Sequence, residues 1–159
     1  MSWFSRRRSS NDGWAPWQAE RLEFERAVLT EFHPDFALIG STRKSTIVRG
    51  RWTSPLGISY TIEIYLSAAF PDEAPRAYVA DPFPLRGYGG VAMHTYGASH
   101  QMHTFQSNRD RSTQICAVHP DAWDASWSLA KVIQKVQLWI VAYEFHKESG
   151  KPVDAYLLS

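Results

Sequence analysis

The chain contains a single cysteine, Cys116, which is the first candidate for chemistry. It lies in the run Gln-Ile-Cys-Ala-Val-His-Pro-Asp-Ala-Trp at residues 114–123, between an irregular, histidine-rich stretch and a strongly periodic helical pattern. A thiolate is a strong nucleophile near neutral pH, so a thiol at such a junction can serve a large partner that reaches it. A free cysteine is also often buried as a small apolar residue. The pattern of residues on both sides favours the nucleophile.

Nearby histidines and aspartates are candidates for supporting such a nucleophile. His103 precedes the cysteine by thirteen residues, and His119 follows it by three. A protonated His119 would lower the pKa of the thiol, whereas an exposed one would only face solvent. A cysteine hydrolase would use His103 or His119 as its base and Asp121 as the residue that orients the base.

The same region also permits a metal site. His100 and His103, together with Cys116 and His119, have the two-residue separations of a four-ligand zinc site. In that alternative the cysteine is a ligand and the protein is a structural or binding module. The preferred interpretation needs neither metal nor cofactor, and an inactive scaffold with an unused cysteine is a further alternative.

Length and composition describe one folded domain. The chain has 159 residues, 44% of them hydrophobic, and seven tryptophans, so it can bury a core without disulfides. A formal net charge of +1 gives no reason to expect nucleic acid or a membrane as the main partner. One cysteine fits a reducing compartment, and no apolar run reaches the roughly 18 residues that span a bilayer. We expect a soluble cytoplasmic protein with a flexible basic tail at 1–13 and one domain at 14–159.

A first amphipathic helix is predicted over residues 16–32. Pro16 suits its first turn, and the pair His33-Pro34 ends it. Its apolar face is expected to hold Trp17, Phe24, Val28 and Phe32, with Leu29 beside them. The residues expected to turn outward are Glu20, Arg21, Glu23, Glu25 and Arg26.

A second helix is predicted from residue 128 to about residue 149. Ser126 or Ser128 is expected to cap its start, and Gly150 to end it in a left-handed conformation. One continuous apolar stripe runs along it, made of Leu129, Val132, Ile133, Val136, Ile140 and Tyr143.

Between the helices the pattern predicts four strands, at residues 36–39, 46–53, 58–66 and 76–80. The third is the clearest, because Tyr60, Ile62, Ile64 and Leu66 alternate with side chains that point the other way. Their connections are too short for parallel crossovers, so we expect an antiparallel meander with a helix on one face, an α+β fold. Periodicity disappears over residues 81–127, and an ordered loop of that length in a small domain is usually functional.

Several local features follow the same order as these elements. Phe70-Pro71 and Pro75 follow the third strand, a histidine precedes the cysteine, Trp123 comes seven residues after it, and the last helix ends in Gly-Lys-Pro at 150–152. This pattern resembles the catalytic core of ubiquitin-conjugating enzymes. The residues from Ile115 to Trp123, and the ending from Glu144 to Lys151, most closely resemble the bacterial branch encoded beside antiphage cyclic-oligonucleotide synthetases, in CBASS operons. The resemblance covers about residues 15–153.

The resemblance implies a fold and a reaction. The fold is the ubiquitin-conjugating (UBC-like) one: an N-terminal helix, a four-stranded antiparallel meander, a long active-site loop and a C-terminal helix. In the reaction, Cys116 takes over an acyl group as a thioester and passes it to an amine. The acyl group is expected to be the C-terminus of the cyclic-oligonucleotide synthetase, with a bacterial ubiquitin-like protein as the alternative donor. The chain has no glycine-rich nucleotide-binding segment, so activation requires a separate enzyme or a pre-activated donor.

The chain departs from the family around the residues that support the reaction. Family members commonly carry His-Pro-Asn about ten residues before the cysteine, whereas this chain has His-Thr-Phe at 103–105. Asn108 is a candidate replacement for the asparagine that supports the oxyanion, and His103 is expected mainly to hold the loop. Asp121 and Asp124 are candidates for steering or desolvating the amine. The residues expected to support the loop or the partner are His119 and Trp123.

Overall fold

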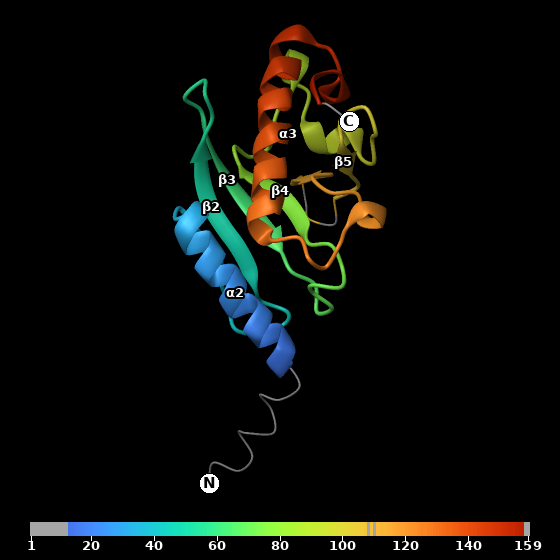
Figure 1. Cartoon of the computed structure of the whole chain (residues 1–159). Helices are drawn as coiled ribbons and strands as arrows, with labels where there is room; N and C mark the ends of the chain where they lie inside the picture. Colours follow the sequence, from blue (N-terminus) through green and yellow to red (C-terminus); the bar gives the residue numbers. More distant parts are fainter. Residues whose placement is uncertain (1–12, 108, 110, 158–159) are drawn as a thin grey trace.

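The computed structural model describes residues 13–107, 109 and 111–157, and in it helix α3 lies across an antiparallel sheet (Figure 1). The chain begins with helix α2 (Pro16–Phe32) and continues through β1 (Phe36–Ile39), β2 (Ile47–Thr53), β3 (Ser59–Tyr65) and β4 (Arg76–Asp81). A long connection follows, with the short helical turns η1 (Tyr88–Gly90), η2 (Met93–Tyr96) and η3 (Pro120–Ala122) and the strands β5 (Thr104–Phe105) and β6 (Thr113–Ile115). Helix α3 (Leu129–Ser149) and the turn η4 (Val153–Tyr156) complete the described chain.

The sheet contains the four predicted strands and two more. Its order is β1-β2-β3-β4-β6-β5, and each neighbouring pair is antiparallel. The α+β class and the meander β1 to β4 are therefore confirmed, but the expectation of only four strands is wrong. The added strands have two and three residues, too few for an alternating pattern to be visible, and all three residues of β6 are buried.

Helix α3 buries the apolar stripe that its sequence predicts. Every residue of the stripe is buried and belongs to one hydrophobic cluster with the inward-facing residues of β3. The N–H of Lys131 donates to the side-chain oxygen of Ser128 at 3.2 Å, which caps the start of the helix. Gly150 ends it in a left-handed conformation with φ 78°. The sequence therefore predicts the bounds, the caps and the buried face of α3 correctly.

Helix α2 has its predicted bounds but buries a different face. The aromatic residues Trp17, Phe24 and Phe32 are 53%, 60% and 64% exposed. The buried residues are Gln18, Leu22, Glu25 and Leu29. The prediction that Glu25 turns outward and the aromatic residues inward is wrong, because polar contacts orient this helix.

Glu25 joins α2 to the beginning of α3. One carboxylate oxygen accepts the backbone N–H of Leu129 at 2.9 Å, and the other accepts from Nε of Arg21 at 2.9 Å. Arg21 also donates to the carbonyl oxygens of Ala125 and Trp127, at 2.5 and 2.7 Å. The first N–H groups of a helix have no partner within the helix and attract negative charge, so the buried carboxylate of Glu25 is stabilised there.

The described chain begins at Gly13, which bridges to Thr42. The basic tail predicted at 1–13 therefore lies outside the described residues, apart from Gly13. None of the helices in the described part of the chain combines the length and the hydropathy of a membrane-spanning segment.

Candidate functional site

Cys116 and His103 are neighbours across the two shortest strands. Cys116 directly follows β6, and His103 directly precedes β5. Since Thr104 pairs with Ile115 in the antiparallel ladder, the next pair outward is His103 with Cys116. The N–H of Cys116 donates to the carbonyl oxygen of His103 at 2.8 Å. The added strands thus bring together two residues that the sequence separates by a long irregular segment.

His103 is held by its backbone and by its ring. Its φ of 51° is left-handed, a conformation that few residues other than glycine adopt. Its Nε2 lies 2.6 Å from Oδ1 of Asp154, and its ring centroid lies 5.3 Å from that of His100. Asp154 lies in η4, where its N–H donates to the carbonyl oxygen of Gln101 at 2.8 Å. The pair therefore ties the segment after α3 to the segment before β5.

The His103–Asp154 pair is a feature that the sequence analysis missed. The hydrogen bond from His103 lowers the pKa of Asp154 below its ordinary value, so this carboxyl is ionised near neutral pH. A carboxylate in this position fixes the orientation of an imidazole. The two residues lie 51 positions apart, and no local pattern connects them.

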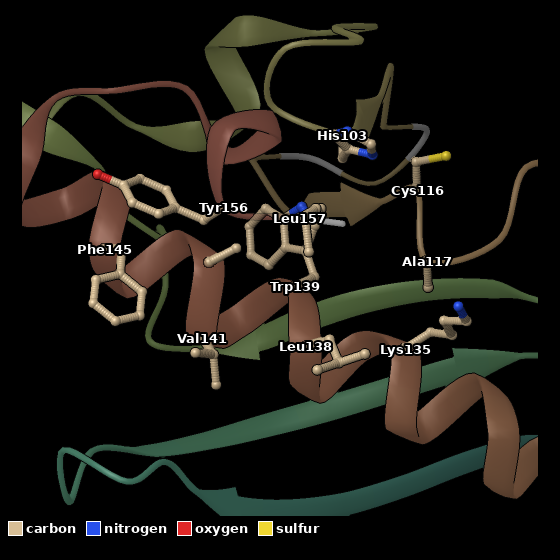
Figure 2. A pocket seen from close by; sticks show the side chains of 11 residues that line it. His103, Cys116, Ala117, Lys135, Leu138, Trp139, Val141, Phe145, Tyr156 and Leu157 are labelled. Atoms are coloured by element: carbon tan, nitrogen blue, oxygen red, sulfur yellow. The ribbon is translucent and has the colours of Figure 1, made fainter. Parts of the chain in front are cut away.

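A cleft of about 400 Å³ opens beside Cys116, between the β5–β6 region, one side of α3 and the segment after α3 (Figure 2). Trp139 forms part of its wall and donates its indole N–H to the carbonyl oxygen of Met102 at 3.0 Å. Figure 2 shows the amino group of Lys135 directed towards Ala117, the residue after the cysteine. Lys135 is not among the site residues predicted from the sequence. The lining residues are His103, Cys116, Ala117, Lys135, Leu138, Trp139, Val141, Ala142, Phe145, Tyr156 and Leu157.

The thiol of Cys116 is partly exposed and is not activated by a neighbouring charge. In Figure 2 its sulfur points away from the ring of His103. Burial raises the pKa of the Cys116 thiol, and no charge among the described residues lowers it. The alternative in which His119 lowers that pKa does not hold in this arrangement. Near neutral pH the thiol is mainly protonated, and it reacts through its minor thiolate form.

The predicted residues that follow the cysteine form a turn outside this cleft. His119 precedes η3 and accepts the N–H of Asp121 at its Nδ1, at 3.2 Å, while the Asp121 side chain is 92% exposed. Asp124 accepts from the N–H and the hydroxyl of Ser126, at 2.8 and 2.6 Å, and these hydrogen bonds lower the pKa of its carboxyl. None of these three predicted side chains lines the cleft.

Trp123 connects this turn to the segment after β3. Its indole N–H donates to the carbonyl oxygen of Pro71 at 2.7 Å. Its ring lies 6.4 Å from that of Phe70 and 6.0 Å from that of Trp127, measured between centroids. These contacts fix the start of the connection to α3. Asn108, the candidate for oxyanion support, lies outside the described residues.

The four candidate zinc ligands do not come together. Among the residues that the structure describes, there is no group of three or more histidine, cysteine, aspartate or glutamate side chains that could hold a metal ion. The rings of His100 and His103 lie close to each other, but the ring of His119 is turned to the backbone N–H of Asp121. This arrangement argues against the zinc-stabilised module.

A second cleft, of about 440 Å³, adjoins the first. Ala117 lines both clefts, so they meet at the residue next to the cysteine. Many of its other lining side chains are short or apolar, among them Ala74, Pro75, Ala77, Ala98 and Val118. Two adjoining clefts of this kind can receive an extended segment of chain that has small side chains.

Together these residues place the cysteine next to a histidine whose imidazole contacts a carboxylate, and an amine lines the same apolar cleft. Such a set can carry an acyl group on sulfur, pass it to nitrogen or release it to water. Comparison of the chain with models of protein families, with curated proteins and with solved structures finds no match.

Proposed function

We propose that this protein is an acyl carrier and transferase of the ubiquitin-conjugating type, with Cys116 as the residue that bears the acyl group. The observation that carries the proposal is the position of Cys116, which is partly exposed at the end of β6 and lines an apolar cleft. An acyl carrier needs a thiol that another protein can reach. It also needs walls that limit the access of water to the thioester.

The proposal includes the ubiquitin-conjugating fold. It is supported by the order of the elements: a helix, a meander of four strands, a long segment with the cysteine, and a helix. The two short strands β5 and β6 lie within that long segment, so they add to the order without changing it.

The chemistry has two steps. First the thiolate of Cys116 attacks the activated carbonyl carbon of the donor; a C–S bond forms, and the activating group leaves. Then a neutral amine attacks the same carbon, a C–N bond forms, and the C–S bond breaks to return the thiol. His103 is proposed to hold the cysteine segment in place, which its backbone contact with Cys116 and its ring contact with Asp154 support.

The proposed donor is the C-terminus of a cyclic-oligonucleotide synthetase in an antiphage (CBASS) operon, with a bacterial ubiquitin-like protein as the alternative. The sequence resemblance suggests this donor. The two clefts that meet at Ala117 suit an extended protein tail with small residues. A free carboxylate does not react with a thiol, so the donor must arrive already activated by a separate enzyme or as a thioester.

A cysteine hydrolase is the second candidate, and the His103–Asp154 pair favours it. In cysteine hydrolases an acidic or amide side chain orients the histidine that serves as base. Here Asp154 contacts the imidazole of His103, whereas the predicted Asp121 lies 3.6 Å from Nδ1 of His119, which does not line the cleft. The raised pKa of the Cys116 thiol argues against this candidate, since such enzymes keep their cysteine as a thiolate.

Intact-mass analysis after coexpression with the candidate donor synthetase tests the proposal. The expected result is an adduct of donor mass on the wild-type chain that a reducing thiol removes. Cys116→Ala should abolish the adduct, Cys116→Ser should form a more stable ester, and Cys116→Lys an amide. An adduct that persists in Cys116→Ala contradicts the proposal. Release of the donor to water, without transfer to any amine, supports the hydrolase instead.

A further inference from the structure

We propose that Lys135 is an internal acceptor: its amino group takes the acyl group from Cys116 and keeps it as an amide. This inference rests on the proposed function, because it requires an acyl group on the sulfur. It places a site of covalent modification on α3. The group that this site accepts is an acyl group, which becomes bonded through its carbonyl carbon.

The cleft contains one amine. Besides Cys116 and Lys135, three lining side chains carry polar atoms, and each of these already has a partner: His103 with Asp154, Trp139 with the carbonyl oxygen of Met102, and Tyr156 with Ser149 at 2.6 Å. No residue in the described part of the chain forms a hydrogen bond or an ion pair with Lys135. Its amino group is therefore free to meet a group that enters the cleft.

The direction of the side chain adds to this argument. Lys135 projects from α3 on the cleft side, with its nitrogen towards Ala117, and the sulfur of Cys116 extends from the adjacent residue (Figure 2). An acyl group on the sulfur adds further reach towards the amine. Two groups held in one cleft react as if at high effective concentration, so a modest nucleophile becomes competitive.

Lys131 shows that position on the helix matters. It lies one turn before Lys135 on the same helix, but its Nζ lies 3.6 Å from the centroid of the Trp127 ring, and it does not line the cleft. A cation over an aromatic face is stabilised in place. The two lysines therefore form a matched pair, with only Lys135 aimed at the cleft.

The step balances without a further reactant. After the ammonium of Lys135 loses one proton to solvent, the neutral amine attacks the thioester carbon. A C–N bond forms, the C–S bond breaks, and a second proton moves from nitrogen to the departing sulfur. The oxidation state of every atom is unchanged. The products are an amide on Lys135 and a free thiol at Cys116, so a transient carrier becomes a permanent attachment point for its donor.

A short peptide thioester that ends in glycine, with mercaptoethanesulfonate as its leaving group, tests this without an activating enzyme. The full chain is mixed with this probe at mildly alkaline pH and followed by intact mass with and without a reducing thiol, and the products are mapped by peptide sequencing. We expect a thiol-labile adduct on Cys116 to form first and a thiol-stable amide on Lys135 to follow. Lys135→Arg should lose the stable product while the labile adduct accumulates. Lys131→Arg should behave as the wild type, and Cys116→Ala should give neither product.

The alternative outcomes separate the two proposals. A labile adduct on Cys116 without an amide on Lys135 overturns this inference and leaves the carrier function in place. An amide on Lys135 in Cys116→Ala also overturns it, because the probe then acylates the lysine directly. Equal modification of Lys131 and Lys135 shows that the cleft does not direct the transfer. No labile adduct on Cys116 overturns the proposed function itself.

Discussion

Among the polar contacts that join distant parts of the described chain, the Glu25 contact and the His103–Asp154 pair differ in burial. Glu25 is 0% exposed and connects α2 to the first turn of α3. His103 and Asp154, in contrast, have side chains that are 22% and 48% exposed, and His103 lines the Cys116 cleft. A buried carboxylate is costly to leave without partners, whereas an exposed pair contributes little to stability. The Glu25 contact should therefore stabilise the fold, and the His103–Asp154 pair should keep the residues around Cys116 in position.

Breaking the Glu25 contact should have the largest effect on stability. Glu25→Ala leaves the N–H of Leu129 and Nε of Arg21 without their acceptor, which should cost about 3 kcal/mol in the free energy of unfolding. Urea denaturation measures this cost. Glu23→Ala is the matched control, since that side chain is 74% exposed and should change stability by less than about 0.5 kcal/mol. Equal effects of the two substitutions would show that the Glu25 contact does not hold the helices together.

The buried and the exposed face of α2 should likewise differ in how much they contribute to stability. Leu22→Ala removes a side chain that is 6% exposed and should cost about 2 to 3 kcal/mol. Phe24→Ser removes a larger apolar side chain, but one that is 60% exposed, so the change should be within about 0.5 kcal/mol. Thermal or urea unfolding of both variants tests which face is buried. A larger loss of stability for Phe24→Ser than for Leu22→Ala would show that the face predicted from the sequence is the buried one.

Asp154→Asn should affect the site more than the fold. The substitution keeps the shape of the side chain but removes the charge that holds the His103 ring. We expect faster amide hydrogen exchange around residues 100–118 and an altered rate of Cys116 alkylation, with a smaller loss of stability than in Glu25→Ala. Asp121→Asn, at a side chain that is 92% exposed, is the control and should change neither.

The stabilising effect of Asp154 should also depend on pH. Its pKa in the folded protein is lowered, so the carboxylate stabilises the fold above the pKa of the unfolded chain and this contribution is lost as the pH falls through the folded value. The difference in Tm between the wild type and Asp154→Asn should thus be largest near neutral pH and should decrease as the pH is lowered. A difference that grows in acid would contradict this assignment.

The smallest predicted effect concerns the thiol. Because burial raises the pKa of Cys116, the folded protein contains less thiolate at neutral pH than the unfolded chain does. Alkylation by iodoacetamide should therefore be slower in the folded protein than in urea, and its rate should reach half of its maximum at a higher pH. A folded-state midpoint below that of the unfolded chain would indicate an activating charge and would favour the hydrolase.

The two helices differ in what orients them, and this difference explains why the buried face of α3 is predicted correctly and that of α2 is not. Helix α3 has an unbroken apolar stripe and lies over the sheet. Its buried carboxylate, Glu144, accepts hydrogen bonds from Ser54 and Tyr60 and comes four residues after Ile140 of the stripe, so its polar contacts and its apolar stripe favour the same face. Helix α2 also carries aromatic residues on one side, but Gln18 and Glu25 find backbone partners and are buried instead. An apolar pattern predicts the buried face only where no buried polar contact competes with it.

The candidate site divides in a similar way. Sequence reasoning selected Cys116 and His103 from residue type and order, and the ladder of β5 and β6 places them side by side. It selected Asp121 and Asp124 because they lie near the cysteine in sequence, yet neither lines the cleft. It missed Asp154 and Lys135, which come from the segment after α3 and from α3 itself. Closeness in sequence was a poor guide to closeness in space in this loop-rich region.

The sequence by itself determined the bounds of both helices, the caps of α3, the four strands of the meander and the α+β class. These depend on periodicity, on proline and glycine, and on capping side chains, all of which act within a few residues. Only the tertiary structure decided that Glu25 is buried, that Asp154 holds His103 and that Lys135 shares a cleft with Cys116. The physical reason is that these contacts depend on how whole elements pack against each other, and the local pattern of a chain does not specify that packing.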